Sequence, residues 1–218
     1  MSLTSPPETP PPPAPEPAPE VVAPDPGRQL SLFGVEAADL SPADLAGLLA
    51  GPGEVVRMGG TARVSVQVDD AWRVHVLVAE LALRGLAASW VPAAQRQYRV
   101  QSSYTSALAP LAVAWLRDTV QGPPAGFHLT GPRLRLWAAA AGAAQPPGFL
   151  FRLGESDERH WSTVGAALAA MGLPAELLTT GWDGRPAYRI TGRRRLARLA
   201  ELVGDRPAAA PVERWPGN

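Results

Sequence analysis

Arginine and glutamine side chains on predicted strands are the groups of this sequence best suited to binding chemistry. In residues 61–69, Arg63 and Gln67 alternate with valines, so they share one polar face of a half-buried strand. Both residue types offer paired hydrogen-bonding groups that match base edges and phosphate oxygens. An ordinary solvated sheet face carries the same pattern, so both interpretations stay open. Six residues on such strands are candidates for contacts in a DNA groove: Arg63, Gln67, Gln97, Arg99, Arg152 and Arg189.

The densest positive charge lies at the start of a predicted helix, 192–204. Leu196, Leu199 and Leu202 form the apolar stripe of that helix. Arginines beside this stripe could hold phosphates and add affinity without reading the base sequence. A solvated helix face explains them equally well. The four arginines are Arg193, Arg194, Arg195 and Arg198.

Charge is balanced overall but distributed unevenly. The chain has 20 basic residues, all of them arginine, and 20 acidic residues. Residues 34–90 contain four arginines and seven acids, whereas residues 91–200 contain thirteen arginines and six acids. A polyanion would therefore be attracted mainly to the second half.

Other kinds of chemistry find little support. The chain has no cysteine, which excludes disulfides, thiolate metal sites and cysteine nucleophiles. His75, His128 and His160 fall on separate elements without carboxylates at ligand spacing, so no metal site is expected. The glycine-rich turns lack a following Lys-Ser/Thr pair, and there is no nucleophile-elbow serine. We therefore expect no enzyme, no cofactor and no small-molecule substrate.

Residues 1–28 are rich in proline, alanine and glutamate and are expected to form a disordered, extended arm. The arm does not have the basic and apolar segments of a signal peptide. No stretch of the sequence approaches the roughly 18 apolar residues that a membrane span needs. We expect a cytoplasmic protein that makes no membrane contact.

A short apolar peptide, residues 29–34, follows the arm. It resembles the bacterial sliding-clamp-binding pentapeptide QL(S/D)LF at all five positions and reads Gln29-Leu30-Ser31-Leu32-Phe33. Such a peptide would insert Leu32 and Phe33 into an apolar pocket, while the Gln29 amide fixes the register. Alternatively, the apolar residues fold back as a first strand, or as a staple against the helix that begins near Ser41.

Hydrophobic periodicity divides the rest of the chain into two halves with one order of elements, repeated after about 90 residues. Residues 205–218 are expected to be a disordered tail. The first half, 40–120, is predicted to have helices at 41–50, 71–86 and 104–118 and strands at 54–58, 61–69, 88–92 and 96–102. The second half, 129–204, is predicted to have helices at 131–142, 156–172 and 192–204 and strands at 148–153, 176–182 and 185–190.

Each half opens with a helix of small residues, Leu45–Gly53 (LAGLLAGPG) and Leu134–Gly142 (LRLWAAAAG). The first resembles the motif of the LAGLIDADG homing endonucleases, and the second matches it more loosely. The resemblance implies an α+β fold of two αββαββα repeats in a pseudo-two-fold arrangement. In that family the motif helices pack together and the sheets lay their polar faces into the DNA major groove. The second repeat is expected to be degenerate, with its first strand reduced to residues 143–147.

The pattern is more similar still to the amino-terminal domain of the WhiA regulators, through the run Gly172-Leu173-Pro174-Ala175. Those proteins are non-cleaving members of the family with an added helix-turn-helix domain, which the residues after Gly204 are too few to form. In cleaving members the metal-binding acids stand at the eighth motif position, which is Pro52 and Ala141 here. Neither residue can bind a metal, and Glu54 lies two residues beyond the first of them.

We therefore expect a non-catalytic protein that binds DNA or is recruited to it, with the sliding clamp as a candidate partner. The first alternative is a protein-interaction adaptor that does not contact DNA. The second alternative is an active nuclease that depends on Glu54. The affinity for DNA held by several arginines should fall steeply as the salt concentration rises. This salt dependence distinguishes a DNA-binding protein from the adaptor.

Overall fold

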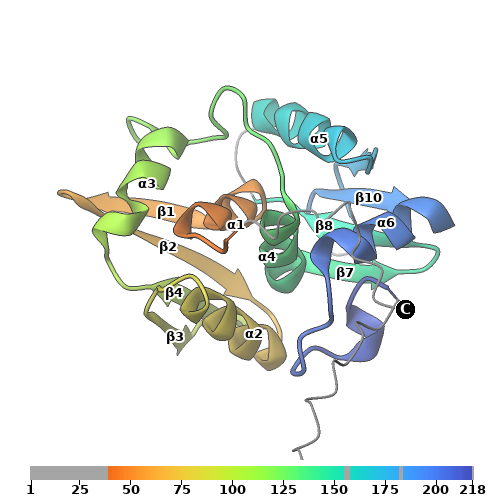
Figure 1. Ribbon diagram of the computed structural model, residues 1–218, viewed down its shortest axis with the longest axis horizontal. Coiled ribbons are helices and arrows are strands. Elements are labelled where there is room, and N and C mark those ends of the chain that lie inside the picture. The colour runs from red at the N-terminus through yellow and green to blue at the C-terminus, as the bar shows by residue number, and fades with distance from the viewer. Residues whose placement is uncertain (1–38, 155–157, 182–183, 218) are drawn as a thin grey trace, which may run out of the picture. The chain divides into compact units, whose positions relative to one another are not determined.

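The structure is a computed structural model that describes residues 39–154, 158–181 and 184–217. The predicted arm and the pentapeptide at 29–33 lie outside these residues. Two four-stranded antiparallel sheets lie next to each other, each with helices packed on one face (Figure 1). No helix in the described part of the chain is both long and apolar enough to cross a membrane.

The first sheet has the strand order β1-β2-β4-β3. Along its strand β2, valines alternate with polar residues. Val64, Val66 and Val68 are buried on the face toward the helices, which confirms the predicted alternation. The Ser41 backbone N–H donates to Asp44 Oδ2 at 3.0 Å, and so starts the first helix as predicted. The elements are η1 (Pro42–Leu45), α1 (Ala46–Ala50), β1 (Glu54–Met58), β2 (Thr61–Val68), α2 (Ala71–Ala82), β3 (Ala88–Pro92), η2 (Ala94–Arg96), β4 (Tyr98–Ser102), η3 (Ser106–Leu108) and α3 (Ala109–Trp115).

The second half repeats this plan, with the strand order β7-β8-β10-β9. A short hairpin that the sequence did not predict, β5 (Leu116–Arg117) with β6 (Val120–Gln121), precedes it. The predicted strands at 176–182 and 185–190 are shorter in the structure. The elements are α4 (Gly131–Ala141), β7 (Gly142–Gln145), β8 (Gly148–Arg152), η4 (Glu158–His160), α5 (Trp161–Ala170), β9 (Glu176–Leu178), β10 (Ala187–Thr191), α6 (Arg193–Val203) and η5 (Val212–Arg214).

The expected loss of the first strand in the second half is wrong. Residues 142–145 form β7, which pairs with β8 from Gly142↔Phe151 to Gln145↔Gly148. Glycine and alanine have low strand propensity, so local composition does not indicate a strand at these residues. The backbone ladder needs no large side chain, and at Gly142 an added Cβ would lie 2.6 Å from the Ala138 carbonyl oxygen. The two halves therefore have matching sheets.

The two motif helices pack together at very short range, as the resemblance implies. A Cβ atom added to Gly47 of α1 would lie 1.9 Å from the backbone oxygen of Arg133 in α4. One added to Gly51 would lie 2.4 Å from Trp137 Nε1. All four alanines at 138–141 of α4 are buried. Small side chains on both helices therefore allow the close contact that joins the two halves.

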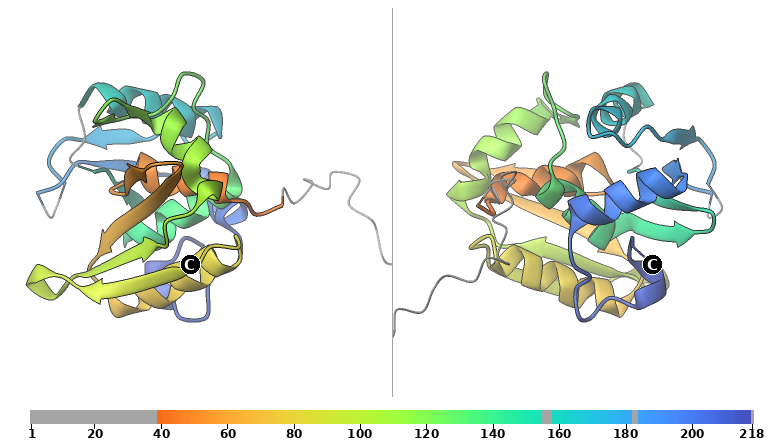
Figure 2. Two further views of the ribbon diagram at one scale, coloured as in Figure 1. Left: turned by 90° about the vertical axis from the view of Figure 1, so that its left-hand side faces the viewer. Right: turned by 45° about the vertical axis from the view of Figure 1, so that its right-hand side comes forward.

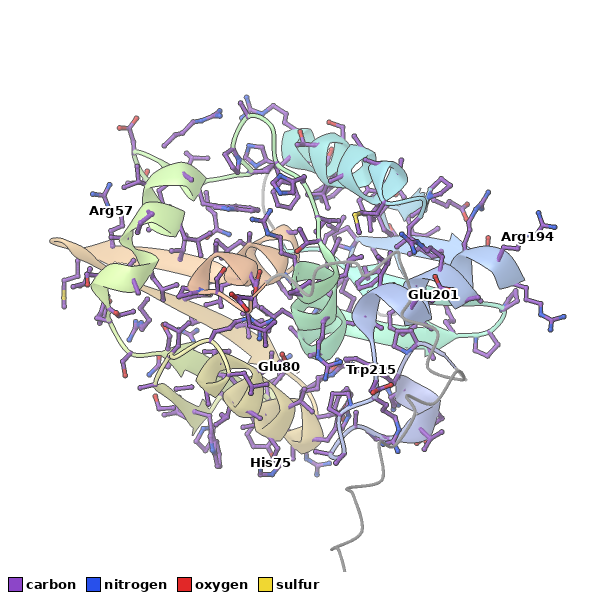
Figure 3. All side chains as sticks on the ribbon, in the orientation of Figure 1. Arg57, His75, Glu80, Arg194, Glu201 and Trp215 are labelled. Atoms are coloured by element: carbon purple, nitrogen blue, oxygen red, sulfur yellow. The ribbon has the colours of Figure 1, made fainter. Side chains whose placement is uncertain are left out.

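A chain of ion pairs crosses the helical layer from the first half to the second. Arg84 joins two carboxylates, with Nε 3.1 Å from Asp44 Oδ2 and Nη1 2.8 Å from Glu80 Oε2. The other oxygen of Glu80 lies 2.6 Å from Arg135 Nε in α4. The guanidinium of Arg135 also lies over the ring of Trp215, 5.4 Å from its centroid. Glu80 and Trp215 are labelled in Figure 3.

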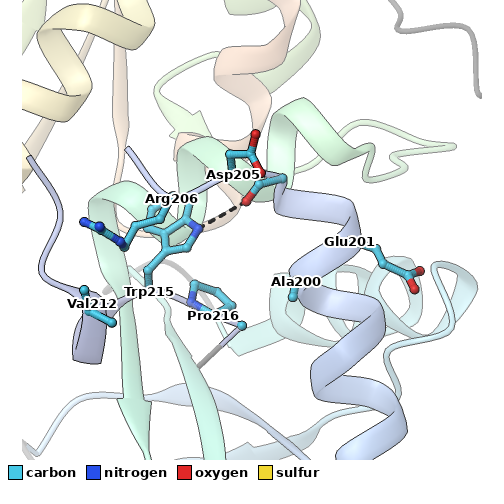
Figure 4. Close-up of a pocket in the computed structure, with 9 residues that line it drawn as sticks. Ala200, Glu201, Asp205, Arg206, Val212, Trp215 and Pro216 are labelled. Carbon is cyan, nitrogen blue, oxygen red and sulfur yellow. Dashed lines mark hydrogen bonds between the residues drawn. The ribbon is translucent and has the colours of Figure 1, made fainter. Parts of the chain in front are cut away.

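The segment after α6 is ordered, so the expected disordered tail is wrong for residues 205–217. Trp215 is only 3% exposed, and its Nε1 donates to the Gly204 carbonyl at 3.3 Å (Figure 4). Arg135 Nη1 donates to the carbonyls of Val203 and Asp205 and holds the turn that begins the segment. Composition rich in proline and alanine suggested disorder, but one buried aromatic side chain fixes the segment.

We predict that Gly47→Ala destabilises the protein. Alanine favours a helix by about 1 kcal/mol over glycine, but here its methyl group must displace the backbone of α4. Overpacking of this kind costs about 1–3 kcal/mol or more, so the clash outweighs the propensity. Denaturant unfolding measures the difference. Gly60→Ala is the control, because an added Cβ there meets nothing within 4 Å. Equal stability of the two variants would contradict the close helix contact.

Candidate nucleic-acid interface

The eighth positions of the two motifs meet at the C-terminal ends of the motif helices. Pro52 follows α1, and Ala141 ends α4. Both line one small space of about 20 Å³ between the sheets, together with Gln67, Asp69, Arg152 and Arg185. Neither proline nor alanine has a ligand atom in its side chain. In the described residues, no three histidine or acidic side chains are grouped so that they could hold a metal. The residues at this junction therefore do not fit a divalent cation.

A buried guanidinium lies at this junction instead. Arg73, on α2 of the first half, is fully buried. Its Nη1 donates to the carbonyls of Ala138 and Ala139 at 3.3 and 2.9 Å, and its Nη2 donates to Gly142 at 2.6 Å. The last carbonyls of a helix have no partner within the helix and lie at the negative end of its dipole. Arg73 therefore caps α4 of the second half with a positive charge.

Asp69 connects this buried cation to the outer surface. Its Oδ1 lies 3.2 Å from Arg73 Nε, and its Oδ2 accepts from Arg152 Nη1 at 2.9 Å. Burial raises the pKa of Asp69, but the hydrogen bond from Arg152 and the charges of Arg152 and Arg73 outweigh it, so the pKa lies below its usual 3.8. Burial lowers the pKa of Arg73 to about 10, against the charge of Asp69. Asp69 and Arg73 therefore both stay charged at neutral pH.

Arg152 was predicted as a groove contact, and its placement corrects that expectation. It is only 9% exposed and pairs with Asp69. All five residues of β8 are buried, because both faces of this central strand are covered. The alternation expected for 148–153 therefore does not produce a solvated face.

The outer face of the first sheet brings three predicted residues together. Gln67 on β2 pairs in register with Arg99 on β4, and Arg63 lies further along the same face of β2. Arg63 also packs over the ring of Tyr104, with its Cζ 4.8 Å from the centroid. Gln97, just before β4, is half-buried and lines the small space at the junction. These side chains form a polar surface next to the junction.

A larger hollow of about 220 Å³ opens beside Pro52, between the two sheets. Arg99 comes from the first half and Arg185 from the second. Arg185 was not among the predicted residues, although it begins the strand predicted at 185–190 and has the same period-two alternation as Arg189. In the structure it lies in the loop before β10. We call this space the junction hollow, and its polar lining consists of Glu54, Ser65, Gln67, Arg99 and Arg185.

The remaining predicted arginines lie elsewhere. Arg189 on β10 is partly exposed and lies 3.6 Å from Glu176 of the neighbouring strand β9. Helix α6 packs through Leu199 and Val203 on the core side of the second sheet, in front of β7 and β8 in Figure 2 (right). The exposed cluster on α6 is therefore in the helical layer, away from the outer faces of the sheets, and Arg194 points outward in Figure 3. This cluster consists of Arg193, Arg194, Arg195 and Arg198.

Arg73 was not predicted as a site residue, although part of its role could be read from the sequence. Asp69 and Asp70 stand four and three residues before it, at spacings where side chains meet on a helix. The carbonyls that it caps belong to another helix 65 or more residues away, which no local pattern indicates.

We predict that Arg73→Met greatly lowers stability. The substitution leaves the last carbonyls of α4 without their cation and takes one of its two paired arginines, Arg73 but not Arg152, from the carboxylate of Asp69. Removing one partner of a buried pair costs about 3–5 kcal/mol. Chemical denaturation measures the loss. Arg193→Met removes one exposed charge from α6 and is expected to change stability by less than about 0.5 kcal/mol. A small effect of Arg73→Met would show that the guanidinium does not hold the two halves together.

Comparison with known proteins finds similarity in structure only. No family model and no curated protein matches this chain. The homing endonuclease I-WcaI bound to its DNA recognition sequence is similar with a TM-score of 0.55 at 11% identity, covering 75% of this chain and 81% of that one. Full-length WhiA from Thermatoga maritima gives a TM-score of 0.54 at 11% identity, with 77% of this chain and 56% of that chain covered. The amino-terminal LAGLIDADG domain of WhiA gives 0.52 at 11% identity, with 76% and 81% covered. The two repeats of this chain thus have the α+β fold of LAGLIDADG and WhiA domains.

Proposed function

We propose that this protein binds duplex DNA with the outer faces of its two sheets and does not cleave it. The observation that carries the proposal is the meeting of polar side chains from both halves at one junction. Gln67 and Arg99 come from the first sheet, and Arg185 comes from the loop before β10. Arginine and glutamine suit both phosphate and base-edge contacts.

Two further points support the proposal. A structurally similar protein, I-WcaI, is bound to its DNA recognition sequence. Cleavage in the resembling family depends on carboxylates at the positions of Pro52 and Ala141, and neither side chain can bind the divalent ion that polarises a phosphate. Glu54 is exposed on β1 and is the acidic side chain that lines the hollow among the residues that the structure describes. The proposed function is therefore recognition or recruitment, in the cytoplasm, rather than nuclease activity.

A specific observation favours the adaptor as the second candidate. The outer face of the first sheet also carries apolar side chains near its edges. Val56 and Met58 on β1 are 44% and 57% exposed, and Val91 on β3 is 46% exposed. Exposed apolar side chains on one face are typical of protein-binding surfaces. An adaptor that uses this face would bind a protein with little dependence on salt.

We predict that the chain binds a labelled duplex and that affinity falls steeply between low and physiological salt. Charge reversal on the sheets, Arg63→Glu with Arg189→Glu, should weaken binding about tenfold or more, which corresponds to about 1.4 kcal/mol. The matched control, Arg194→Glu with Arg198→Glu on α6, should leave affinity nearly unchanged. Fluorescence anisotropy measures both. An affinity that does not change with salt concentration would contradict the proposed interface. So would a larger loss of affinity in the α6 variant than in the sheet variant.

We further propose that residues 29–33 tether the protein to the replication sliding clamp, on the basis of their match to the clamp-binding pentapeptide. The double substitution Leu32→Ala with Phe33→Ala should abolish retention of the full chain on immobilised clamp, because it removes the two apolar anchors. Val35→Ala, just outside the pentapeptide, is the control. DNA affinity should be the same in all three proteins. Full retention of the double variant would remove the tether from the proposal.

A further inference from the structure

We propose that a groove along α6 binds an acidic segment of a partner protein. The groove has a volume of about 860 Å³ and is open to solvent. This inference goes beyond the proposed function, because α6 lies in the helical layer, away from the outer faces of the sheets (Figure 2). We call this space the α6 groove, and its lining includes Leu196, Ala197 and Ala200 of α6 together with Pro147 and Gly217.

Apolar side chains of α6 line the groove and remain accessible to solvent. Leu199 and Val203 of the same helix are buried in the core. Ala197 by contrast is exposed, and Leu196 and Ala200 are half-buried. These three side chains follow the three- and four-residue spacing of one helix face, and the two alanines leave room for another chain to approach. Such a face is typical of grooves that bind a short amphipathic segment.

Positive charge surrounds the N-terminal end of the groove. Helix α6 carries four arginines and one glutamate. Arg198 uses part of its charge in an exposed pair with Glu201, at 3.2 Å. Arg193 and Arg194 are both exposed, and neither forms an ion pair or a hydrogen bond with another described residue. These two guanidinium groups are therefore available to an acidic partner.

The position of the arginines within α6 opposes the stability of the helix. Arg193, Arg194 and Arg195 occupy the first turn, where the positive end of the helix dipole favours acidic side chains. The first turn has no acidic residue, and the last turn has no basic one. A feature that works against local stability is expected where function requires it. Both the arginines and the dipole attract a negatively charged ligand to this end of the groove.

The corresponding helix of the first repeat carries no charge. Helix α3 follows β4 as α6 follows β10, yet Ala109–Trp115 includes no acidic or basic residue. Val113 on α3 is 58% exposed. A helix at this place in the fold therefore does not need arginines to face solvent. The charge of α6 belongs to the second repeat alone, which favours a partner over simple solvation.

Charge and apolar lining together favour an acidic peptide segment over a nucleic acid. The phosphate backbone of a duplex would meet the arginines but leave the apolar side chains of the groove uncovered. Glu201 lines the C-terminal part of the groove and disfavours a ligand that is negatively charged along its whole length. An amphipathic segment with its acidic end near Gly192 and its apolar side chains over Ala197 satisfies both features.

The test measures binding of a labelled synthetic peptide to the full chain by fluorescence anisotropy. The probe is an amphipathic helix with leucines on one face and with glutamates gathered at one end. One matched probe has glutamine in place of every glutamate, and a second has serine in place of every leucine. The first probe should bind at physiological salt. Either replacement should weaken binding about tenfold or more, because the groove recognises both charge and apolar surface.

Substitutions in the chain locate the binding site. Arg193→Gln with Arg194→Gln should weaken probe binding about tenfold, and these changes should not lower stability, because the arginines oppose the helix dipole. Ala197→Gln places a longer polar side chain in the groove and should also weaken binding. Arg63→Gln with Arg99→Gln removes two charges from the outer face of the first sheet and should leave probe binding unchanged. Circular dichroism checks that all variants are folded.

Each outcome bears on the inference directly. Probe binding that survives an excess of duplex DNA, and that falls in both α6 variants, would support a separate protein-binding surface. Failure of the acidic probe to bind would overturn the inference, as would equal binding of the glutamine probe or full binding by the Arg193/Arg194 variant. Displacement of the probe by duplex would assign α6 to DNA instead. Displacement by vesicles of phosphatidylglycerol would assign it to a membrane surface, and either result would overturn the inference.

Discussion

The contact between Arg73 and the end of α4 is the interaction on which the arrangement of the two halves depends. The side chain belongs to the first repeat, and the three carbonyls that it binds belong to the second. A buried charge is costly unless its hydrogen-bonding capacity is used. Here carbonyls and Asp69 surround the guanidinium, so it can remain charged in the interior. The contact fixes where α4 ends, and β7 begins at the next residue.

The position of the sheets follows from this contact and from the small residues of the motif helices. Gly47 and the alanines of α4 let the helices approach closely, which places the two sheets on one side of the helical layer. The junction hollow opens where the helices end. At this junction Arg73 and Arg152 are paired with Asp69, while Arg99 and Arg185 line the hollow.

Much of the fold could be predicted from local patterns. The valines of β2 alternate as a half-buried strand must, and the Ser41 and Asp44 side chains mark the start of a helix. The errors arise where tertiary contacts override composition. Residues 142–145, which include one glycine and two alanines, form a strand through their backbone pairing with β8. Trp215 orders a segment whose other residues suggest disorder.

The candidate site was predictable only in part, for the same physical reason. Residues on a regular half-exposed strand, such as Gln67 and Arg99, are revealed by period-two alternation. Arg152 breaks the pattern because its strand is covered on both faces. Arg185 has the same alternation as Arg189 and could have been included, whereas the role of Arg73 depends on a helix distant in sequence. The face on which α6 carries its arginines follows from packing that no local pattern specifies.

The most direct test of the central claim is the nuclear magnetic resonance signal of each arginine Nε–Hε group, recorded with and without duplex DNA. Because all basic residues of the chain are arginines, one spectrum reports on every cationic side chain. Binding through the sheets predicts large shifts for Arg63, Arg99 and Arg185 and unchanged signals for the α6 cluster. Shifts confined to the α6 cluster, or none when DNA is bound, would contradict the account.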